Sequence, residues 1–377
     1  MAGIYLHIPF CRQACHYCDF HFSTQVKTMG DLLQAMRREL QSRRNYLEGE
    51  AIETIYFGGG TPSLVPTDDI QRILDDIYTY FPVVEKPEIT LEANPDDLTY
   101  HKIIELARTP VNRLSIGIQS FRNQDLQWMN RAHTAAQADF SVKCAQDRGF
   151  ENITIDLIYS IPGLSERDWL ENIRRAVDMQ VQHISAYSLT IEPKTAFGHQ
   201  LAKQELQPVD DQTSGTQFLV LVQELKRCGF EQYEVSNFCL PGMRSKHNSA
   251  YWLGKKYLGV GPSAHSFNGA TRQWNVASNP LYVKGWMNGI PEFEIETLDS
   301  RSQHNEYLMT RLRTSWGIDL EHIRNEFGVD LWKTENDYLL QLLQDGLMVK
   351  ENSTLTLTTQ GLLQADRIAS ELFILAT

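Results

Sequence analysis

The chain has 377 residues and carries a formal net charge of −12 at pH 7. A protein that binds duplex nucleic acid normally presents a basic face, so this charge argues against nucleic acid as the main partner. No apolar run is long enough to span a membrane, and the N-terminal stretch lacks the features of a signal peptide, so we expect a cytoplasmic protein. The length exceeds what one small core needs, which predicts a large domain and a smaller one.

Strands and helices alternate over the first half of the chain. Apolar, β-branched runs predict strands at 4–8, 54–57, 89–92, 113–119, 153–158 and 184–189. Helical periodicity lies between them, at 31–46, 67–80, 135–148 and 166–179. This alternation indicates a parallel α/β sheet, either doubly wound or a partial (β/α)6 barrel. We favour the barrel, over residues 1–210, because the polar and glycine-rich segments follow the strands directly.

The pattern changes after about residue 193. A long helix is predicted over 211–228, and short strands and turns rich in glycine and aromatic residues should follow it to about residue 286. We assign residues 211–297 to an extension of the barrel. Residues 298–377 read as several helices with a short hairpin near 347–357. They predict a compact, mostly helical and winged-helix-like domain.

Three of the six cysteines form the motif C-x₃-C-x₂-C at Cys11, Cys15 and Cys18. The others, at 144, 228 and 239, stand alone, and we interpret them as small buried hydrophobic residues. Because disulfides are rare in a reducing cytoplasm, clustered cysteines indicate metal or redox chemistry.

The cysteine motif fits two kinds of metal site. A structural zinc ion needs a fourth ligand, for which His16 or His21 could serve. On a [4Fe–4S] cubane, three thiolates leave one iron open, and that iron can take a bidentate ligand such as the amino and carboxylate groups of methionine.

The residues around the cysteines carry a family resemblance. The string Tyr5-Leu-His-Ile-Pro-Phe-Cys11, followed by Cys15-His-Tyr-Cys18-Asp-Phe, resembles the radical SAM superfamily. Within it, the string resembles the branch of oxygen-independent coproporphyrinogen III oxidase and the haem chaperone HemW. The resemblance implies a [4Fe–4S] cluster on the three cysteines, S-adenosylmethionine (SAM) on the open iron, and an electron donor such as a flavodoxin or ferredoxin.

A glycine run, Gly58-Gly-Gly-Thr61, follows the second predicted strand. Glycines let the backbone approach a ligand closely, and the lack of a following G-K-[ST] argues against a nucleotide phosphate loop. By resemblance, Gly59, Gly60 and Thr61 contact the methionine amino group of SAM, and Glu92 at the end of the third strand contacts the ribose.

Further polar and aromatic residues complete the SAM pocket by resemblance. Gln119, Arg131 and Asp156 would contact the adenosyl end, and Tyr5 and Tyr17 match aromatic positions near the cofactor. Packing in the core is the alternative for the two tyrosines. A buried aspartate within an apolar strand is costly unless it is hydrogen-bonded or paired, so Asp156 is expected to face the barrel interior.

Two features separate this chain from the oxidase. The oxidase has a further cysteine two positions after the cluster motif, where Phe20 stands here. It also has a long arm ahead of its first strand, whereas Tyr5 lies almost at the start of this chain. Since that arm helps to form the oxidase site, oxidative decarboxylation is the less favoured activity.

One motif favours the chaperone. Lys246-His247-Asn-Ser-Ala-Tyr251-Trp252 reads H-N-x-x-Y-W, which resembles a motif typical of HemW. Imidazole is a common haem ligand and aromatic rings can stack on a porphyrin face, so His247 is a candidate haem ligand. A hydrogen-bonded structural histidine is the alternative.

We therefore expect a haem chaperone-like radical SAM protein that binds a [4Fe–4S] cluster, SAM and haem and delivers haem to an acceptor protein. The alternatives are an oxygen-independent coproporphyrinogen III oxidase of porphyrin biosynthesis and a non-catalytic metal-cluster scaffold. No catalytic residue is assigned. An exposed cluster could also support a homodimer.

Overall fold

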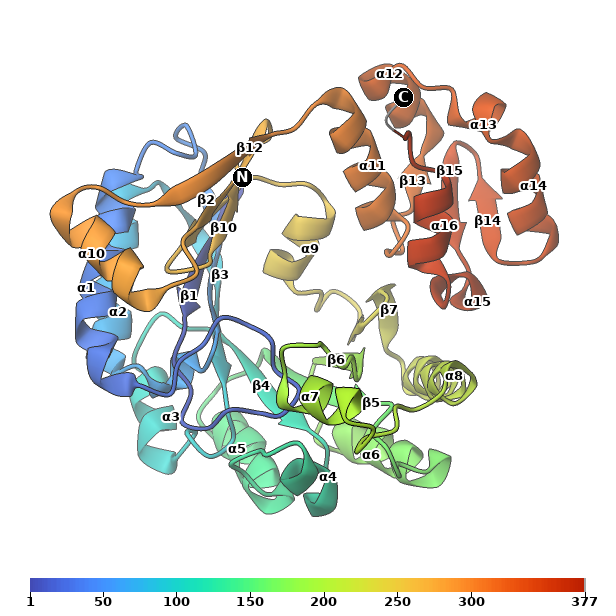
Figure 1. Ribbon diagram of the computed structural model, residues 1–377. Helices are drawn as coiled ribbons and strands as arrows, with labels where there is room; N and C mark the ends of the chain where they lie inside the picture. Colours follow the sequence, from blue (N-terminus) through green and yellow to red (C-terminus); the bar gives the residue numbers. More distant parts are fainter. Residues whose placement is uncertain (376–377) are drawn as a thin grey trace.

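A single curved sheet of twelve strands dominates the computed structural model, which describes residues 1–375 (Figure 1). Its centre is a run of parallel strands that follow one another in chain order. These are β1 (Ala2–Ile8), β2 (Ile52–Gly59), β3 (Val83–Ala93), β4 (Arg113–Gln119), β5 (Ile153–Tyr159) and β6 (His183–Ser188). Each contains or closely matches a predicted strand, so the predicted partial barrel is confirmed.

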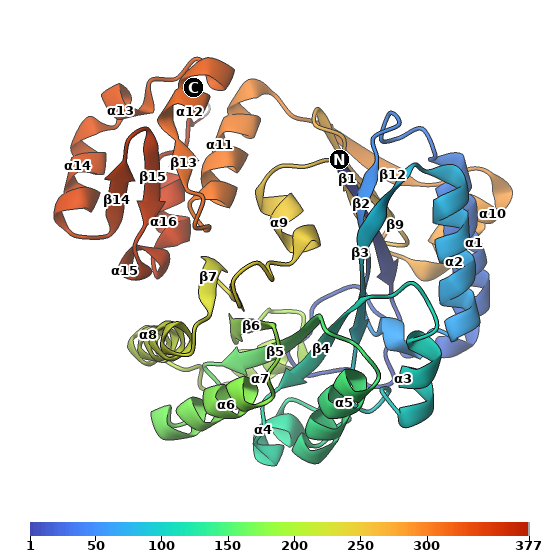
Figure 2. The ribbon, with the colours of Figure 1, turned by 180° about the vertical axis from the view of Figure 1, so that it is seen from behind.

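Helices cover the outer face of this sheet, as Figures 1 and 2 show. They are α1 (Met29–Ser42), α2 (Thr67–Tyr80), α3 (Tyr100–Leu106), α4 (Asn123–Trp128), α5 (Ala135–Asp147) and α6 (Glu166–Asp178), with 3-10 turns η1 (Val26–Thr28) and η2 (Pro62–Leu64). In α2 the buried residues fall at the helical spacing Ile70, Ile73, Leu74 and Ile77. This apolar stripe packs against the strands and leaves the polar face to solvent.

The segment after β6 extends both edges of the sheet. Beyond α7 (Ala196–Ala202) and α8 (Asp211–Arg227), the hairpin β7 (Glu231–Glu234) and β8 (Asn237–Cys239) pairs antiparallel with β6. At the opposite edge β9 (Tyr257–Val260) pairs parallel with β1, and β10 (His265–Phe267), β11 (Thr271–Asn275) and β12 (Phe293–Thr297) follow it antiparallel. The sheet therefore stays open, because both edge positions of the barrel are taken by added strands.

Two helices correct the expectation of only strands and turns between residues 229 and 286. The first, α9 (Lys246–Trp252), is capped by the Ser245 hydroxyl and carries the H-N-x-x-Y-W motif; the second is α10 (Asn279–Asn288). Helix α9 has only seven residues, too few to show a helical period in the sequence. The motif thus lies on a helix on the inner side of the sheet (Figure 1).

The C-terminal part has its own hydrophobic core, separate from that of the barrel. Its helices are α11 (Ser300–Arg311), α12 (Leu320–Phe327), α13 (Leu331–Thr334), α14 (Asn336–Gln344), α15 (Thr359–Leu362) and α16 (Ala365–Glu371). Strands β13 (Ile318–Asp319), β14 (Met348–Glu351) and β15 (Thr354–Leu357) form a small antiparallel sheet. The predicted helical domain with a hairpin is confirmed. In the described residues, no helix is both long and apolar enough to cross a membrane.

A buried polar network ties the added strands to the barrel. The fully buried Glu39 carboxylate of α1 pairs with Arg43 (3.0 Å) and accepts hydrogen bonds from Asn275 Nδ2 (2.8 Å), the Tyr282 hydroxyl and the Gly261 N–H (3.0 Å). These partners come from β11, α10 and the turn after β9. Because the charge is fully satisfied, its burial can be tolerated.

Removing this carboxylate should destabilise the protein severely. We expect Glu39→Ala to lower the free energy of unfolding by about 3–5 kcal/mol, because Arg43 is left buried without its ion pair. Urea denaturation followed by circular dichroism measures the change. The exposed Glu171→Ala is the matched control and should change the value by at most about 0.5 kcal/mol. A similarly small effect of Glu39→Ala would contradict this role of the network.

Candidate cofactor site

A cavity of about 450 Å³ lies at the carboxyl ends of the central parallel strands and beneath the cysteine loop, residues 9–23. Parallel strands deliver their carboxyl ends to one edge, so residues far apart in sequence meet there. The cavity is lined by most of the predicted site residues: Cys11, Cys15, Tyr17, Cys18, Gly59, Gly60, Thr61, Glu92, Gln119, Arg131 and Asp156. Tyr5 and His247 do not line it.

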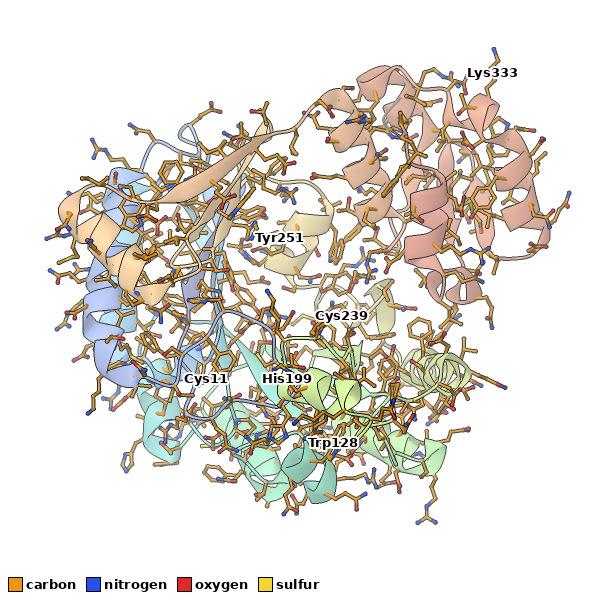
Figure 3. The ribbon with its side chains drawn as sticks, in the orientation of Figure 1. Cys11, Trp128, His199, Cys239, Tyr251 and Lys333 are labelled. Carbon is orange, nitrogen blue, oxygen red and sulfur yellow. The ribbon has the colours of Figure 1, made fainter. Side chains whose placement is uncertain are left out.

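The cysteine loop is fastened to the barrel by its backbone. The Cys11 N–H donates to the Ser23 carbonyl (3.1 Å), and the His16 N–H donates to the carbonyl of Met129 (3.1 Å). Figure 3 labels Cys11 at this loop. Cys11, Cys15 and Cys18 are free, half-buried thiols. Burial raises the pKa of Cys11, and it raises that of Cys18 to about 12.

The three cysteines do not form a site for a single metal ion among the described residues. Among residues 1–375, no three His, Cys, Asp or Glu side chains are placed to ligate one metal ion. The three thiols instead share one cavity, as is required when each sulfur binds a different iron of a cubane.

The two histidines considered as zinc ligands have other partners. His16 Nδ1 lies 3.0 Å from the Trp128 carbonyl, and its ring packs edge-on against Phe197. His21 Nε2 lies 2.7 Å from Asn279 Oδ1. Neither lines the cavity that the three cysteines share. The isolated cysteines are buried at 144 and 239 and half-buried at 228.

The glycine run is needed because the cysteine loop crosses it closely. A Cβ on Gly60 would lie 2.7 Å from the Phe10 carbonyl oxygen. Gly59 has a φ of 106°, a conformation that favours glycine, and a Cβ there would lie 2.7 Å from the His7 ring. The two glycines therefore allow the cysteine loop to pack closely against the end of β2, and they also expose backbone to the cavity.

Glu92 is held at the end of β3 by two donors. The Tyr56 hydroxyl donates to Oε1 (2.7 Å) and the Gly59 N–H donates to Oε2 (3.1 Å). Burial raises the pKa of Glu92 to about 7. On β5, burial likewise raises the pKa of Asp156 to about 6. Both carboxyls can thus change charge near neutral pH.

Arg131 joins the cysteine loop to the strand ends. Its guanidinium donates to Asn94 Oδ1 (2.7 Å) and the Gly117 carbonyl (2.8 Å), and Nη1 reaches Cys15 Sγ at 3.3 Å. Asn94 in turn donates to Thr61 Oγ1 (3.1 Å), whose hydroxyl donates to Cys11 Sγ at 3.5 Å. A continuous set of hydrogen bonds therefore connects the sulfurs of Cys11 and Cys15.

Sequence reasoning missed part of the lining. Asn94 belongs to the string Glu92-Ala-Asn94-Pro at the end of β3. Its position at a strand end was the one signal in the sequence that could have identified it as a lining residue. Ser115 and Gly117 of β4, Tyr187 of β6 and Glu192 also line the cavity. Gln119 has a φ of 69°, a left-handed conformation at the strand end that non-glycine residues seldom adopt.

Tyr5 and His247 lie deeper in the barrel. The Tyr5 hydroxyl bonds His7 Nδ1 (3.1 Å). The His247 ring is buried, with Nδ1 2.7 Å from Thr54 Oγ1 and Nε2 3.0 Å from the Tyr251 hydroxyl. Since both ring nitrogens are engaged, direct haem ligation by His247 would require α9 to move.

Comparison with known proteins identifies the family. The model of the radical SAM superfamily matches residues 5–176, and that of the HemN C-terminal domain matches residues 298–363. The chain is 32% identical to the heme chaperone HemW of Bacillus subtilis, over 98% of both chains. It is also 32% identical to heme chaperone HemW of Mycobacterium tuberculosis, over 98% of this chain and 94% of that one.

The fold has a solved counterpart. Coproporphyrinogen III oxidase (HemN) from Escherichia coli, a radical SAM enzyme, superposes with a TM-score of 0.83 at 21% identity, over 99% of this chain and 90% of that one. That likeness establishes the architecture alone. Together with the full-length identity to the curated relatives, it leads to one conclusion: the chain belongs to the HemW family of the radical SAM superfamily.

Proposed function

We propose that this protein is a haem chaperone that binds a [4Fe–4S] cluster, SAM and haem and passes haem to an acceptor protein. The observation that carries the proposal is the full-length likeness to relatives named heme chaperone HemW. The cavity supports it, because three thiols and the polar strand ends line one space. A cytoplasmic location and a single-electron donor such as a flavodoxin or ferredoxin belong to the same proposal.

The residues of the cavity divide between the two cofactors. When bound, the cluster and SAM together supply reductive cleavage of the sulfonium. Cys11, Cys15 and Cys18 would hold the cluster. Hydrogen bonds from Thr61 and Arg131 would offset part of the negative charge on the thiolates of Cys11 and Cys15. The methionine end of SAM would meet Gly59 and Gly60, and the adenosyl end would meet Glu92, Gln119 and Asp156.

The mouth of the cavity leaves room for a protein partner. Phe20 lines it beside Cys18, and 67% of its surface is exposed. An exposed aromatic ring near a redox centre suits a docking surface for an electron donor or for a second copy of the chain. We include both partners in the proposal.

The second candidate function is coproporphyrinogen III oxidation, which the shared architecture with HemN favours. Two assays under anaerobic conditions, with SAM and a reductant, separate the candidates. In the first, we expect one equivalent of haem to bind to the protein and then to transfer to an apo-haemoprotein. In the second, we expect no porphyrinogen product to form from coproporphyrinogen III. Absorbance spectroscopy and chromatography of the products measure these outcomes. Decarboxylated product would contradict the chaperone proposal, and haem transfer without product would contradict the oxidase.

Removing one cluster thiol should abolish the cluster. We expect Cys15→Ser to lose most iron and acid-labile sulfide after anaerobic reconstitution, because a hydroxyl is a harder and weaker iron ligand than a thiolate. Iron and sulfide analysis with visible absorbance measures the loss. Cys228→Ser, half-buried and outside the cavity, is the matched control and should reconstitute like the wild type. Equal iron and sulfide in both variants would refute the ligand assignment.

SAM affinity should increase with pH. Burial raises the pKa of Glu92 to about 7 and the pKa of Asp156 to about 6, so each accepts hydrogen bonds as a carboxylate only above those values. Between about pH 5 and about pH 8 we expect the dissociation constant of SAM to fall by about tenfold, since hydrogen bonds to a charged acceptor are the stronger ones. Calorimetric titration of the reconstituted protein measures this.

The control for the pH dependence is Glu92→Gln, which keeps the side-chain shape without its titration. The variant should bind SAM weakly and show a flatter profile over the same range. Comparison with the wild type removes the titration of SAM itself. Profiles of equal slope would rule out Glu92 as the titrating group.

A further inference from the structure

A second cavity, of about 510 Å³, lies between the barrel and the C-terminal helices. Residues of α9, of the strands β9 to β11, and of α11 and α12 line it. Figure 3 labels Tyr251 of α9 between the sheet and these helices. Its volume falls within the range of about 300–1,000 Å³ that is usual for small-molecule and cofactor sites.

The barrel side of this cavity is a wall of half-buried aromatic rings. Tyr251, Trp252, Tyr257 and Phe267 line it. Tyr251 and Tyr257 meet edge to face, with ring centroids 4.7 Å apart. Rings that are fixed by one another and partly exposed to a cavity offer flat apolar area to a planar ligand.

The C-terminal side provides a second aromatic wall. Tyr307 and His322 have ring centroids 4.7 Å apart and an interplanar angle of 35°, and Phe327 packs edge-on against His322. All three line the cavity. Aromatic rings therefore line the cavity on both of its sides.

The charged lining offers one cation that forms no ion pair. Lys255, Arg272 and Arg311 line the cavity, against the carboxylates Glu306 and Glu326. Glu306 is paired with Arg272 at 2.8 Å, and Lys255 is paired with a glutamate outside the cavity. Among the described residues, Arg311 and Glu326 are the charged lining groups that these pairings leave over.

Two of the cationic groups have unused donors. The Arg311 guanidinium lies over the Tyr307 ring at 5.4 Å and makes no ion pair or hydrogen bond within residues 1–375. Arg272 Nε is buried and has no hydrogen-bond partner among the described residues. A carboxylate on a ligand in the cavity could accept from the Arg311 guanidinium.

The cavity also presents an imidazole. The ring of His322, an exposed residue, makes no hydrogen bond to any described residue, unlike His247, whose two ring nitrogens are both engaged. A neutral imidazole nitrogen is a common ligand of haem iron. Aromatic walls, cations and a free imidazole are together the groups that recognise a planar metal chelate with carboxylate side chains.

We propose that this cavity between the barrel and the C-terminal helices is the haem site, with His322 as an iron ligand and Arg311 as a partner of a propionate. The assignment rests on the proposed haem-binding function and specifies where haem lies. It also gives Tyr251 and Trp252 of the H-N-x-x-Y-W motif a role in stacking. Because the two walls belong to parts with separate hydrophobic cores, bound haem would bridge them.

The test is titration of the full-length chain with ferric haem and with metal-free protoporphyrin IX, followed by Soret absorbance. We expect His322→Ala to lose the spectral signature of imidazole coordination and to weaken haem binding by about tenfold or more, with protoporphyrin IX affinity nearly unchanged. Arg311→Gln should weaken the binding of both haem and protoporphyrin IX by about tenfold, since it removes a hydrogen bond to a charged group.

Two control variants complete the test. His101→Ala removes an exposed histidine on α3, outside the cavity, and should bind both ligands like the wild type. His247→Ala should keep the coordination signature. If the wild type binds one haem and His322→Ala and Arg311→Gln bind it equally well, the site assignment is wrong while the function stands. Loss of the signature only in His247→Ala would also overturn it. Failure of the wild type to bind haem would overturn both proposals.

Discussion

The cofactor site depends on one buried guanidinium, that of Arg131. Among the described residues it pairs with no carboxylate: its two terminal nitrogens bond a sulfur, an amide and a backbone carbonyl, and its Nε has no hydrogen-bond partner. Removing a cation from water is costly, so it is tolerated only where several acceptors converge. The carbonyl of Gly117 and the amide of Asn94 are fixed by β4 and β3, and the cysteine loop supplies the remaining acceptor. The position of the loop is thereby set by the sheet, and the sulfurs can face the cavity before any cluster is bound.

An open sheet is the second condition for this site. A closed barrel fills its interior with side chains. Here β9 and β8 occupy the two edges beside β1 and β6, so the sheet curves without closing and its inner face carries buried polar side chains. The network around Glu39 secures the added strands on one side. Residues 211–297, which the sequence indicated only as an extension of the barrel, are therefore part of the architecture that keeps the cavity open.

Local patterns in the sequence were sufficient for the six central strands and the cysteine motif, whereas most of the cavity lining was predicted from the family resemblance. The carboxyl ends of parallel strands meet by topology, so naming the strands also brings Glu92, Gln119 and Asp156 together. What could not be predicted depends on contacts between distant segments. Helix α9 is too short for a period, and the role of Asn94 requires Arg131 and Thr61 to be placed first. The second cavity is formed by three segments, residues 251–272, 298–311 and 322–327, and no single motif encodes it.

The two cavities are joined by a short series of contacts through the H-N-x-x-Y-W helix. Glu92 of the first cavity accepts a hydrogen bond from Tyr56, and the Tyr56 ring stacks on His247 with centroids 4.9 Å apart. His247 Nε2 then meets the hydroxyl of Tyr251, which lines the second cavity. Helix α9 therefore lines the second cavity with Tyr251 and Trp252, and it reaches the first cavity only through the Tyr56 ring, which lies between His247 and Glu92. A histidine that is buried and fully hydrogen-bonded is, in that position, better suited to transmit the placement of α9 than to bind iron itself.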